Sequence, residues 1–394
     1  MTTHSYHIFQ FPSIDSIDVN NLVGCGDWTE KCKKECINDA GPIPRIVHFL
    51  KLDGGVFTVR EWISVLSARK YIKPERIIVY SANKISDSCW WRRTLPFVEH
   101  HILPREVLIK TLNGVPLKTL THQSDFIRNS LLYHVGGVYV DTDMFIVKSI
   151  EELLEDRQAV VSREDTGFIS SALMLLRRNS CFMCTHARRA CENYDGWWLS
   201  HATITLHKVV EQKEDFPGLF VIADFKRGFC PISCTSLTCG WKLFDASMKS
   251  INFNLSQAYS VHLTNTFTGQ KQKTTLQNYE WISTSPSAVA AAARKVLPLW
   301  FNATYLDEKK CIDLPKEERI GPISPMFVLK GIPTQATIMY KKSGIIALVP
   351  RAYFSCIPTG YGFCIDLSWI ILGVIVIIFN CYFLYSARRC KIFH

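Results

Sequence analysis

The sequence predicts an α/β protein with a mostly parallel sheet, and three observations support this class. Between residues 42 and 283, short apolar runs typical of buried strands alternate with stretches of helical periodicity, which is the pattern of βαβ units. No long linker rich in Pro, Gly or Ser and no solenoid-type repeat divides the chain. The length of 394 residues and the apolar share of 47% allow one substantial core.

The predicted elements follow one another along the chain. The run RIIVY at 76–80 is short and apolar, which favours a strand, whereas Trp62, Val65 and Leu66 recur at helical spacing. Strands are predicted at residues 43–50, 76–80, 106–109, 138–140, 144–147, 169–176, 219–223 and 259–263. Helices are predicted at residues 59–71, 124–133, 202–210 and 288–296.

The most informative stretch is residues 124–143. A helix over 124–133 ends at Gly136-Gly137, whose conformational freedom allows a tight turn. The strand that follows, 138–140, leads directly into Asp141-Thr142-Asp143. Ligands of open α/β sheets bind at the carboxyl ends of strands. The acidic triplet is therefore predicted at a ligand site.

The two acids of the triplet have the chemistry of a metal site. Side chains alternate along an extended segment, so Asp141 and Asp143 point to the same side. Two convergent carboxylates suit Mn²⁺ or Mg²⁺, which complete their shells with water and substrate phosphates. Such an ion would neutralise the charge that develops on a departing diphosphate. The alternative is an acidic turn at a strand end, because about one Asp-x-Asp is expected by chance in a chain of this length.

Asp125 and Arg128 lie three residues apart, and therefore on one face of the predicted helix. That face precedes the Gly-Gly turn and can fold back over the triplet. Arg128 would then hold a phosphate or sugar oxygen, and Asp125 would accept a hydrogen bond from a hydroxyl. The alternative is a salt bridge on a solvated helix face.

Residues 124–143, SDFIRNSLLYHVGGVYVDTD, resemble the signature of the DXD-containing sugar-binding glycosyltransferases. The shared pattern is Ser-Asp, an Arg three residues on, Leu-Tyr, Gly-Gly, an aromatic residue and Asp-x-Asp. Residues 44–49 are similar to the family's opening strand, and 259–265 to a late strand, so the resemblance covers about residues 42–270. It implies a GT-A fold and a retaining, Mn²⁺-dependent transfer, with Mg²⁺ as the other candidate ion. The donor would be UDP-galactose or UDP-N-acetylglucosamine, and the acceptor a glycan or glycolipid.

The resemblance also implies roles for residues at matched positions. Asp143 would bind the metal directly, and Asp141 would contact the donor and reach the metal through water. His262 matches a late metal or phosphate contact, although a single histidine in an apolar strand is more often a core residue.

Four further residues are assigned to the donor by the same resemblance. Asp125 and Arg128 would hold the transferred sugar, with Asp141 completing the catalytic set. Tyr139 would support the site. His48 would approach the nucleotide, with the same alternative of a core role.

The chain departs from the family pattern in two places, and we therefore consider two alternative functions. Ser170-Ser171-Ala172 stands where the family usually has Asn-Gly-Ala, and His201-Ala202 where a helix usually opens with Gly-Pro. One alternative is therefore a binding protein of the same fold with weak or no turnover. A dehalogenase-type phosphatase is disfavoured, because Phe145 occupies the position where that class has Thr or Val.

The fifteen cysteines favour an oxidising compartment. No second Cys-x-x-Cys or His pair accompanies Cys181-x-x-Cys184, so buried thiols or disulfide partners are predicted there, and not zinc. Disulfides are also predicted for two clusters, Cys25, Cys32 and Cys36, and Cys230, Cys234 and Cys239. The net charge of +10 is spread along the chain, so no nucleic-acid partner is predicted.

Residues 367–385, from Leu367 to Tyr385, form an uncharged apolar run long enough for a transmembrane helix. Basic residues follow it, which places the C-terminus in the cytosol and the rest in the lumen of the Golgi or endoplasmic reticulum. Residues 1–41 contain no apolar leader, so this topology expects one outside the given sequence. The alternatives are a reversed tail anchor and a buried helix. The predicted segments are a Cys-containing lead-in at 1–41, the GT-A domain at 42–283, an extension at 284–366, the membrane helix at 367–385 and a basic tail at 386–394.

Overall fold

The computed structural model describes residues 25, 28–164, 166–212, 216–228, 244, 255–263, 275–299, 301–312, 356–358 and 364–366. The chain divides into two units, Met1–Lys330 and Gly331–His394. In the second unit the described residues form an antiparallel pair, β12 (Cys356–Pro358) and β13 (Cys364–Asp366). All other described elements belong to the first unit.

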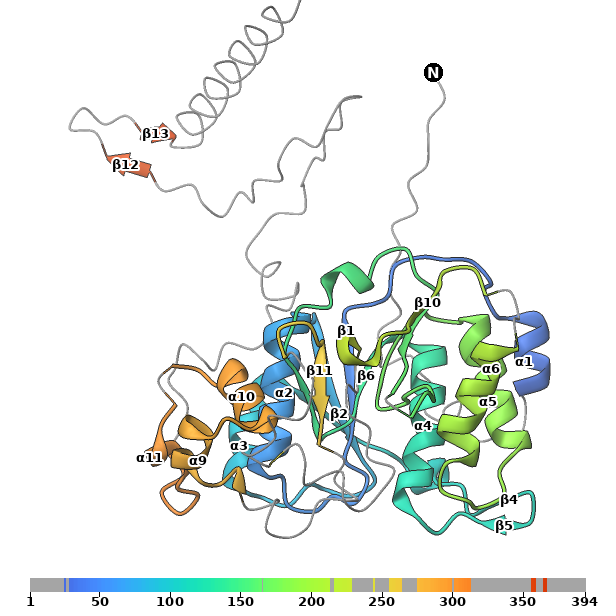
Figure 1. The fold of residues 1–394 in the computed structure, drawn as a ribbon, viewed down its shortest axis with the longest axis horizontal. Helices are drawn as coiled ribbons and strands as arrows, with labels where there is room; N and C mark the ends of the chain where they lie inside the picture. Colours follow the sequence, from blue (N-terminus) through green and yellow to red (C-terminus); the bar gives the residue numbers. More distant parts are fainter. Residues whose placement is uncertain are drawn as a thin grey trace, which may run out of the picture. The chain divides into compact units, whose positions relative to one another are not determined.

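A seven-stranded sheet with the strand order β10-β8-β9-β6-β1-β2-β3 lies in the first unit. Figure 1 shows α2, α3 and α10 on one side of its strands β1, β2 and β6, and α4, α5 and α6 on the other. Neighbouring strands are parallel except for β9, which is antiparallel to both β6 and β8. The strands are β1 Ile46–Leu50, β2 Arg76–Ser81, β3 Glu99–Ile102, β6 Gly137–Val140, β8 Ala159–Ser162, β9 Leu173–Leu176 and β10 Leu219–Ile222. The predicted α/β class with a mostly parallel sheet is confirmed.

Helices cover both faces of this sheet and enclose two apolar cores. Val47 and Phe49 of β1 belong to the core beneath α2, α3 and α10, whereas Ile46 and Leu50 belong to the core beneath α1, α4 and α5. One strand supplies both cores because successive side chains point to opposite faces. The α-helices are α1 Trp28–Lys34, α2 Val59–Ile72, α3 Cys89–Thr94, α4 Leu120–His134, α5 Cys181–Glu192, α6 Thr205–Glu211, α9 Tyr279–Thr284, α10 Ala288–Val296 and α11 Ala303–Leu306.

Short elements complete the first unit. Two small antiparallel pairs are β4 (Thr111–Leu112) with β5 (Val115–Pro116), and β7 (Met144–Ile146) with β11 (Ser260–His262). The 3₁₀ turns are η3 Leu95–Phe97, η4 Arg105–Val107, η5 Glu151–Leu153 and η7 Phe225–Arg227, and η6 Ser200–Ile204 is a π-helical turn.

The strand predicted at 106–109 is wrong. Residues Arg105–Val107 form the 3₁₀ turn η4 directly after Pro104, and the third strand of the sheet is β3, Glu99–Ile102. β3 pairs only with β2 and lies at the edge of the sheet. Its sequence, EHHI, is polar because an edge strand has no second neighbour and remains partly solvated. The apolar signal used to find buried strands therefore does not apply to it.

The transmembrane helix in the predicted fold also requires correction. In the part of the chain that the structure describes, no helix is both long and apolar enough to cross a membrane. The longest helix there, α4, has 15 residues and buries several polar side chains, whereas a span needs about 20 predominantly apolar residues. Residues 367–385, for which the helix is predicted, lie outside the described residues.

Disulfides fasten the N-terminal segment to the domain. Three of them join residues 25–36 to α5, namely Cys25–Cys191, Cys32–Cys184 and Cys36–Cys181. A fourth, Cys89–Cys311, ties the segment 301–312 to α3. The predicted disulfide role of Cys181 and Cys184 is confirmed, while Cys230, Cys234 and Cys239 lie outside the described residues.

We expect the Cys89→Ser/Cys311→Ser double variant to lose about 2–5 kcal/mol of unfolding free energy, because it opens a large loop. The bridged cysteines are 222 residues apart, and no other disulfide among the described residues reaches this segment. Removing Cys25–Cys191 should cost less, since Cys32–Cys184 still closes nearly the same loop. Urea unfolding of both variants without reductant measures the difference. An equal or larger loss in the Cys25 pair contradicts the expectation.

Candidate functional site

A cleft of about 620 Å³ opens where β1 and β6 end. From β1 the chain continues to β2 and β3 on one side, whereas β6 lies on the other side of β1. The order of the sheet therefore reverses between β1 and β6, and such a switch point is where open α/β sheets bind ligands. Side chains from α4, the turn between β6 and β7, the connection from β8 to β9, the segment before α6 and β11 line the cleft.

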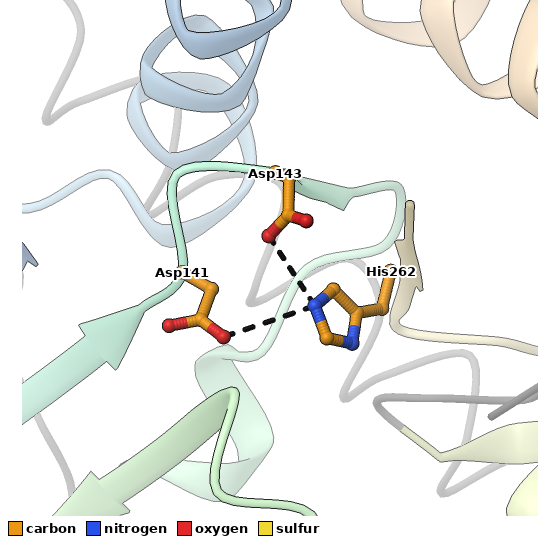
Figure 2. A group of neighbouring side chains, drawn as sticks. All are labelled: Asp141, Asp143 and His262. Carbon is orange, nitrogen blue, oxygen red and sulfur yellow. Dashed lines mark ion pairs between the residues drawn. The ribbon is translucent and has the colours of Figure 1, made fainter. Parts of the chain in front are cut away.

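Two carboxylates and one imidazole converge in this cleft (Figure 2). Asp141 and Asp143 stand on the turn that joins β6 to β7, and His262 ends β11, which pairs with β7. The Nε2 atom of His262 lies 3.2 Å from Oδ1 of Asp143 and 3.7 Å from Oδ2 of Asp141. The backbone N–H of Leu263 donates to the Asp143 carbonyl at 3.0 Å, which fixes the register of the two segments.

The arrangement fits a single divalent cation. One ligand atom from each of Asp141, Asp143 and His262 lies within 4.8 Å of the others. Adjacent ligands of a six-coordinate ion with bonds of about 2.1 Å are about 3 Å apart, and the His262 nitrogen lies 3.2 Å and 3.7 Å from the nearest oxygens of Asp143 and Asp141. Burial, together with the charge of Asp143, raises the pKa of Asp141 above its ordinary value in spite of Arg128. A bound cation would remove the repulsion between the two acids.

Arg128 connects the second pair of predicted residues to the first. Its Nη2 atom lies 3.0 Å from Oδ1 of Asp125 and 3.3 Å from Oδ1 of Asp141. Its guanidinium packs over the ring of Tyr139 at 4.3 Å, and Nη1 donates to the Ser171 carbonyl at 2.7 Å. The side chains of Asp125 and Arg128 are 9% and 5% exposed, so this is not a solvated surface salt bridge.

Tyr139 supports the same network. Its hydroxyl donates to Oδ1 of Asp141 at 2.6 Å, the oxygen that also faces Arg128. The remaining oxygen, Oδ2, faces His262. The network therefore orients the Asp141 carboxylate with one oxygen toward Arg128 and one toward the metal site.

His201 is a site residue that pattern matching did not assign. It is fully buried in the π-helical turn η6, and its Nε2 atom lies 2.9 Å from Oδ2 of Asp125. Burial acts to raise the pKa of Asp125, but Arg128 and His201 outweigh it, and the pKa lies below its ordinary value. The only signal in the sequence was the departure from the family pattern at this position. Ser171, the partner of Arg128, lies in the other departure.

His48 takes no part in the lining of the cleft. Its buried ring lies 2.9 Å from the Gly136 carbonyl oxygen through Nε2 and 3.1 Å from the Tyr80 hydroxyl through Nδ1. Burial lowers its pKa to about 4, although the bond to Gly136 opposes this. At Gly137, with φ +102°, a Cβ would lie 2.4 Å from the Ile46 carbonyl oxygen. Glycine is thus required where the turn crosses β1, and His48 fastens that crossing.

Lys51 is another lining residue that the sequence reasoning missed. It follows β1 directly and pairs with Glu61 at 2.9 Å and Asp53 at 3.1 Å. The rule that identified the acidic triplet, polar residues directly after a buried strand, would also have found it.

The comparisons with known proteins concern the family and cover only part of the chain. Residues 66–160 match the family model described as glycosyltransferase sugar-binding region containing DXD motif, which confirms the resemblance seen in the sequence. The chain is 23% identical over 156 residues to glucan organizing enzyme 1 of Cryptococcus neoformans, covering 36% of this chain and 40% of that protein. It is 28% identical over 78 residues to lactosylceramide 4-alpha-galactosyltransferase of Pongo pygmaeus, covering 20% and 34%.

These matches are partial. The chain spans about 40% and 34% of the lengths of the two curated relatives. Among solved structures, the PaToxG glycosyltransferase aligns with a TM-score of 0.37 and 15% identity, over 48% of this chain and 74% of that one.

Proposed function

We propose that this chain, whose residues 66–160 match the DXD sugar-binding region, is a metal-dependent glycosyltransferase. It moves a hexose or N-acetylhexosamine from a nucleotide sugar, UDP-galactose or UDP-N-acetylglucosamine, to a hydroxyl of a glycan or glycolipid, with retention of configuration. The observation that carries the proposal is the convergence of Asp141, Asp143 and His262 beside the buried pair Asp125 and Arg128 in one cleft.

The residues of the cleft form two groups, one for the diphosphate of the donor and one for its sugar. Asp141, Asp143 and His262 would hold the cation, which supplies charge neutralisation at the diphosphate leaving group. Arg128 keeps its charge at every relevant pH and faces the sugar side of the triplet through Asp141. Asp125, held on both oxygens by Arg128 and His201, is fixed to accept a hydrogen bond from a sugar hydroxyl.

The donor set favours Mn²⁺ over Mg²⁺. Carboxylate oxygens suit both ions, but an imidazole nitrogen suits a transition metal better. His262 is therefore the residue that supports manganese, with magnesium as the weaker candidate. We propose that the domain lies in the lumen of the Golgi or endoplasmic reticulum, and the four disulfides found among the described residues support an oxidising compartment.

A specific observation keeps a second function in view, namely a binding protein with little turnover. His201 takes one oxygen of Asp125 and Arg128 takes the other. An acid engaged on both oxygens has less capacity left for a substrate. Donor binding without hydrolysis or transfer would favour this alternative.

We expect the full chain to hydrolyse slowly one member of a panel of UDP- and GDP-sugars when MnCl₂ is present. Water then replaces the acceptor, so the assay needs no knowledge of it. Activity should disappear with excess EDTA and return with added MnCl₂. Release of nucleotide measures turnover, and isothermal titration of the same donors measures binding. Turnover that survives EDTA contradicts the metal mechanism, and binding without turnover selects the second function.

A further inference from the structure

The cleft carries an apolar wall that donor chemistry leaves unexplained. Trp197, Leu199 and Phe168 line it together with the metal-site residues. Trp197 is 59% exposed, the largest aromatic side chain left this open among the described residues. An exposed tryptophan beside a polar catalytic group is unfavourable in water and is typical of a binding surface.

A hydrogen-bonded turn at residues 195–200 holds Trp197 in its exposed position. Oδ1 of Asp195 accepts from the Trp197 backbone N–H at 2.8 Å and from the Ser200 hydroxyl at 2.5 Å. Between them Gly196 adopts φ +83°, and a Cβ there would lie 2.9 Å from Val115. Such a turn limits the entropy lost when a ligand orders the indole ring. The exposure of Trp197 is thus a property of the fold.

The topology places one residue of this wall, Phe168, away from the nucleotide side of the cleft. Phe168 lies in the connection from β8 to β9, and both strands lie on the opposite side of β6 from β1. The switch point between β1 and β6 is the place for the nucleotide. A ligand that contacts Phe168 would therefore approach the triplet from the side away from the nucleotide, and Trp197 lines the same cleft.

We propose that Trp197 is the platform of the acceptor subsite and stacks against the apolar face of a terminal hexopyranose. This inference rests on the proposed function, since a transferase needs a second substrate next to the donor sugar. A hexopyranose suits the platform because its ring C–H groups gather on one face while its hydroxyls lie at the edge. The edge hydroxyls then meet the polar side chains Ser124 and Thr203 of the same cleft.

The test compares Trp197→Ala and Trp197→Phe with a matched control, Phe220→Ala. Phe220 is an aromatic residue 39% exposed on β10 and does not line the cleft. Saturation-transfer NMR is recorded on the full chain with UDP, MnCl₂ and methyl β-galactoside, methyl β-glucoside or methyl α-mannoside. We expect Trp197→Ala to weaken binding of at least one glycoside about tenfold or more, Trp197→Phe to retain most of it and Phe220→Ala to match the wild type.

A kinetic measurement distinguishes an effect on the acceptor from an effect on the donor. In transfer assays with the same glycosides, the Trp197→Ala effect should appear in the acceptor KM and not in the donor KM. A larger effect on the donor KM, or glycoside binding equal to that of the wild type, overturns the inference. If the wild type binds a glycoside through Trp197 but turns over no donor, Trp197 remains a sugar-binding platform, whereas its acceptor role fails together with the proposed function. If no glycoside shows binding that depends on Trp197, the inference is wrong whatever the activity.

Discussion

We expect the Asp143→Asn variant to lose metal-dependent turnover of its UDP-sugar by about a thousandfold or more. Asp143 offers a carboxylate oxygen 3.2 Å from the His262 nitrogen, at the centre of the candidate metal site. Asparagine keeps the shape but offers a neutral ligand, so the site loses charge where the diphosphate leaves. Lewis-acid stabilisation of several kcal/mol corresponds to this loss of rate.

The stability of the same variant gives a second readout. Without metal, burial and, to a smaller extent, the charge of Asp143 raise the pKa of Asp141, and the effect of Asp143 reflects repulsion between the two acids in the folded state. Replacing Asp143 removes the repulsion, so the metal-free variant should be at least as stable as the wild type. The wild type should gain stability when MnCl₂ binds the folded state, and the variant should not. Thermal unfolding with and without MnCl₂ measures both effects.

The matched control is Asp87→Asn, the same exchange at an exposed acid that pairs with Arg92 outside the cleft. It should retain wild-type turnover and the wild-type response to MnCl₂. Full activity of Asp143→Asn would refute the proposed mechanism. If the variant is inactive but still gains stability from MnCl₂, the metal binds without Asp143.

The parts of the fold that could be predicted are those with local signals. The helix at 288–296 is observed with the same bounds, and the strand at 76–80 extends by one residue. β8 and α5 were not predicted. The pattern of α5 is dominated by cysteines and basic residues, so its apolar face is partly made of sulfur that pairs with residues 25–36. The helical spacing of its buried residues Met183, Cys184, Ala187, Ala190 and Cys191 becomes visible when the cysteines are counted as apolar residues and not only as disulfide partners.

The distinction between local and distant signals also explains which site residues could be predicted. Asp125, Arg128, Tyr139 and the triplet lie within one continuous segment, so spacing alone places them on a helix face, a strand and a turn. Contacts across the chain have no such signal. His201 reaches Asp125 over 76 positions, and the Ser171 carbonyl reaches Arg128 over 43. These contacts depend on how η6 and the end of the β8–β9 connection lie beside α4, which tertiary packing determines.

The Arg128→Met variant should lose about 3–5 kcal/mol of unfolding free energy at pH 7, because it leaves buried carboxylates without their partner. Arg128 faces Asp125 at 3.0 Å and Asp141 at 3.3 Å, and it packs on the Tyr139 ring. Methionine fills a similar volume, so the loss reflects charge and not a cavity. Donor turnover should also fall strongly, since Arg128 is the residue that we propose holds the donor sugar. Urea unfolding and donor hydrolysis measure the two effects.

The control is Arg188→Met, which removes a surface pair with Glu192 and should cost at most about 1 kcal/mol. Arg128→Lys keeps the charge but lacks the planar fork that reaches Asp125, Asp141 and Ser171 together. The unfolding free energy and the turnover of Arg128→Lys should therefore lie between those of the wild type and of Arg128→Met. Similar losses in Arg128→Met and Arg188→Met would show that the buried network does not depend on Arg128.

The pH dependence of this loss identifies its cause. In the wild type the pKa of Asp125 lies below its ordinary value, so its stabilising contribution is present at neutral pH and is lost as the pH falls through that lowered pKa. Without Arg128, burial loses its strongest opponent at both carboxyls, so the pKa values of Asp125 and Asp141 should rise, even though His201 still lowers that of Asp125 and His262 that of Asp141. Protonation of these two carboxylates then removes the cost of burying them without a cationic partner as the pH falls toward about 4. The stability difference between Arg128→Met and the wild type should consequently shrink from pH 7 to pH 5, whereas a difference caused by lost packing would stay constant.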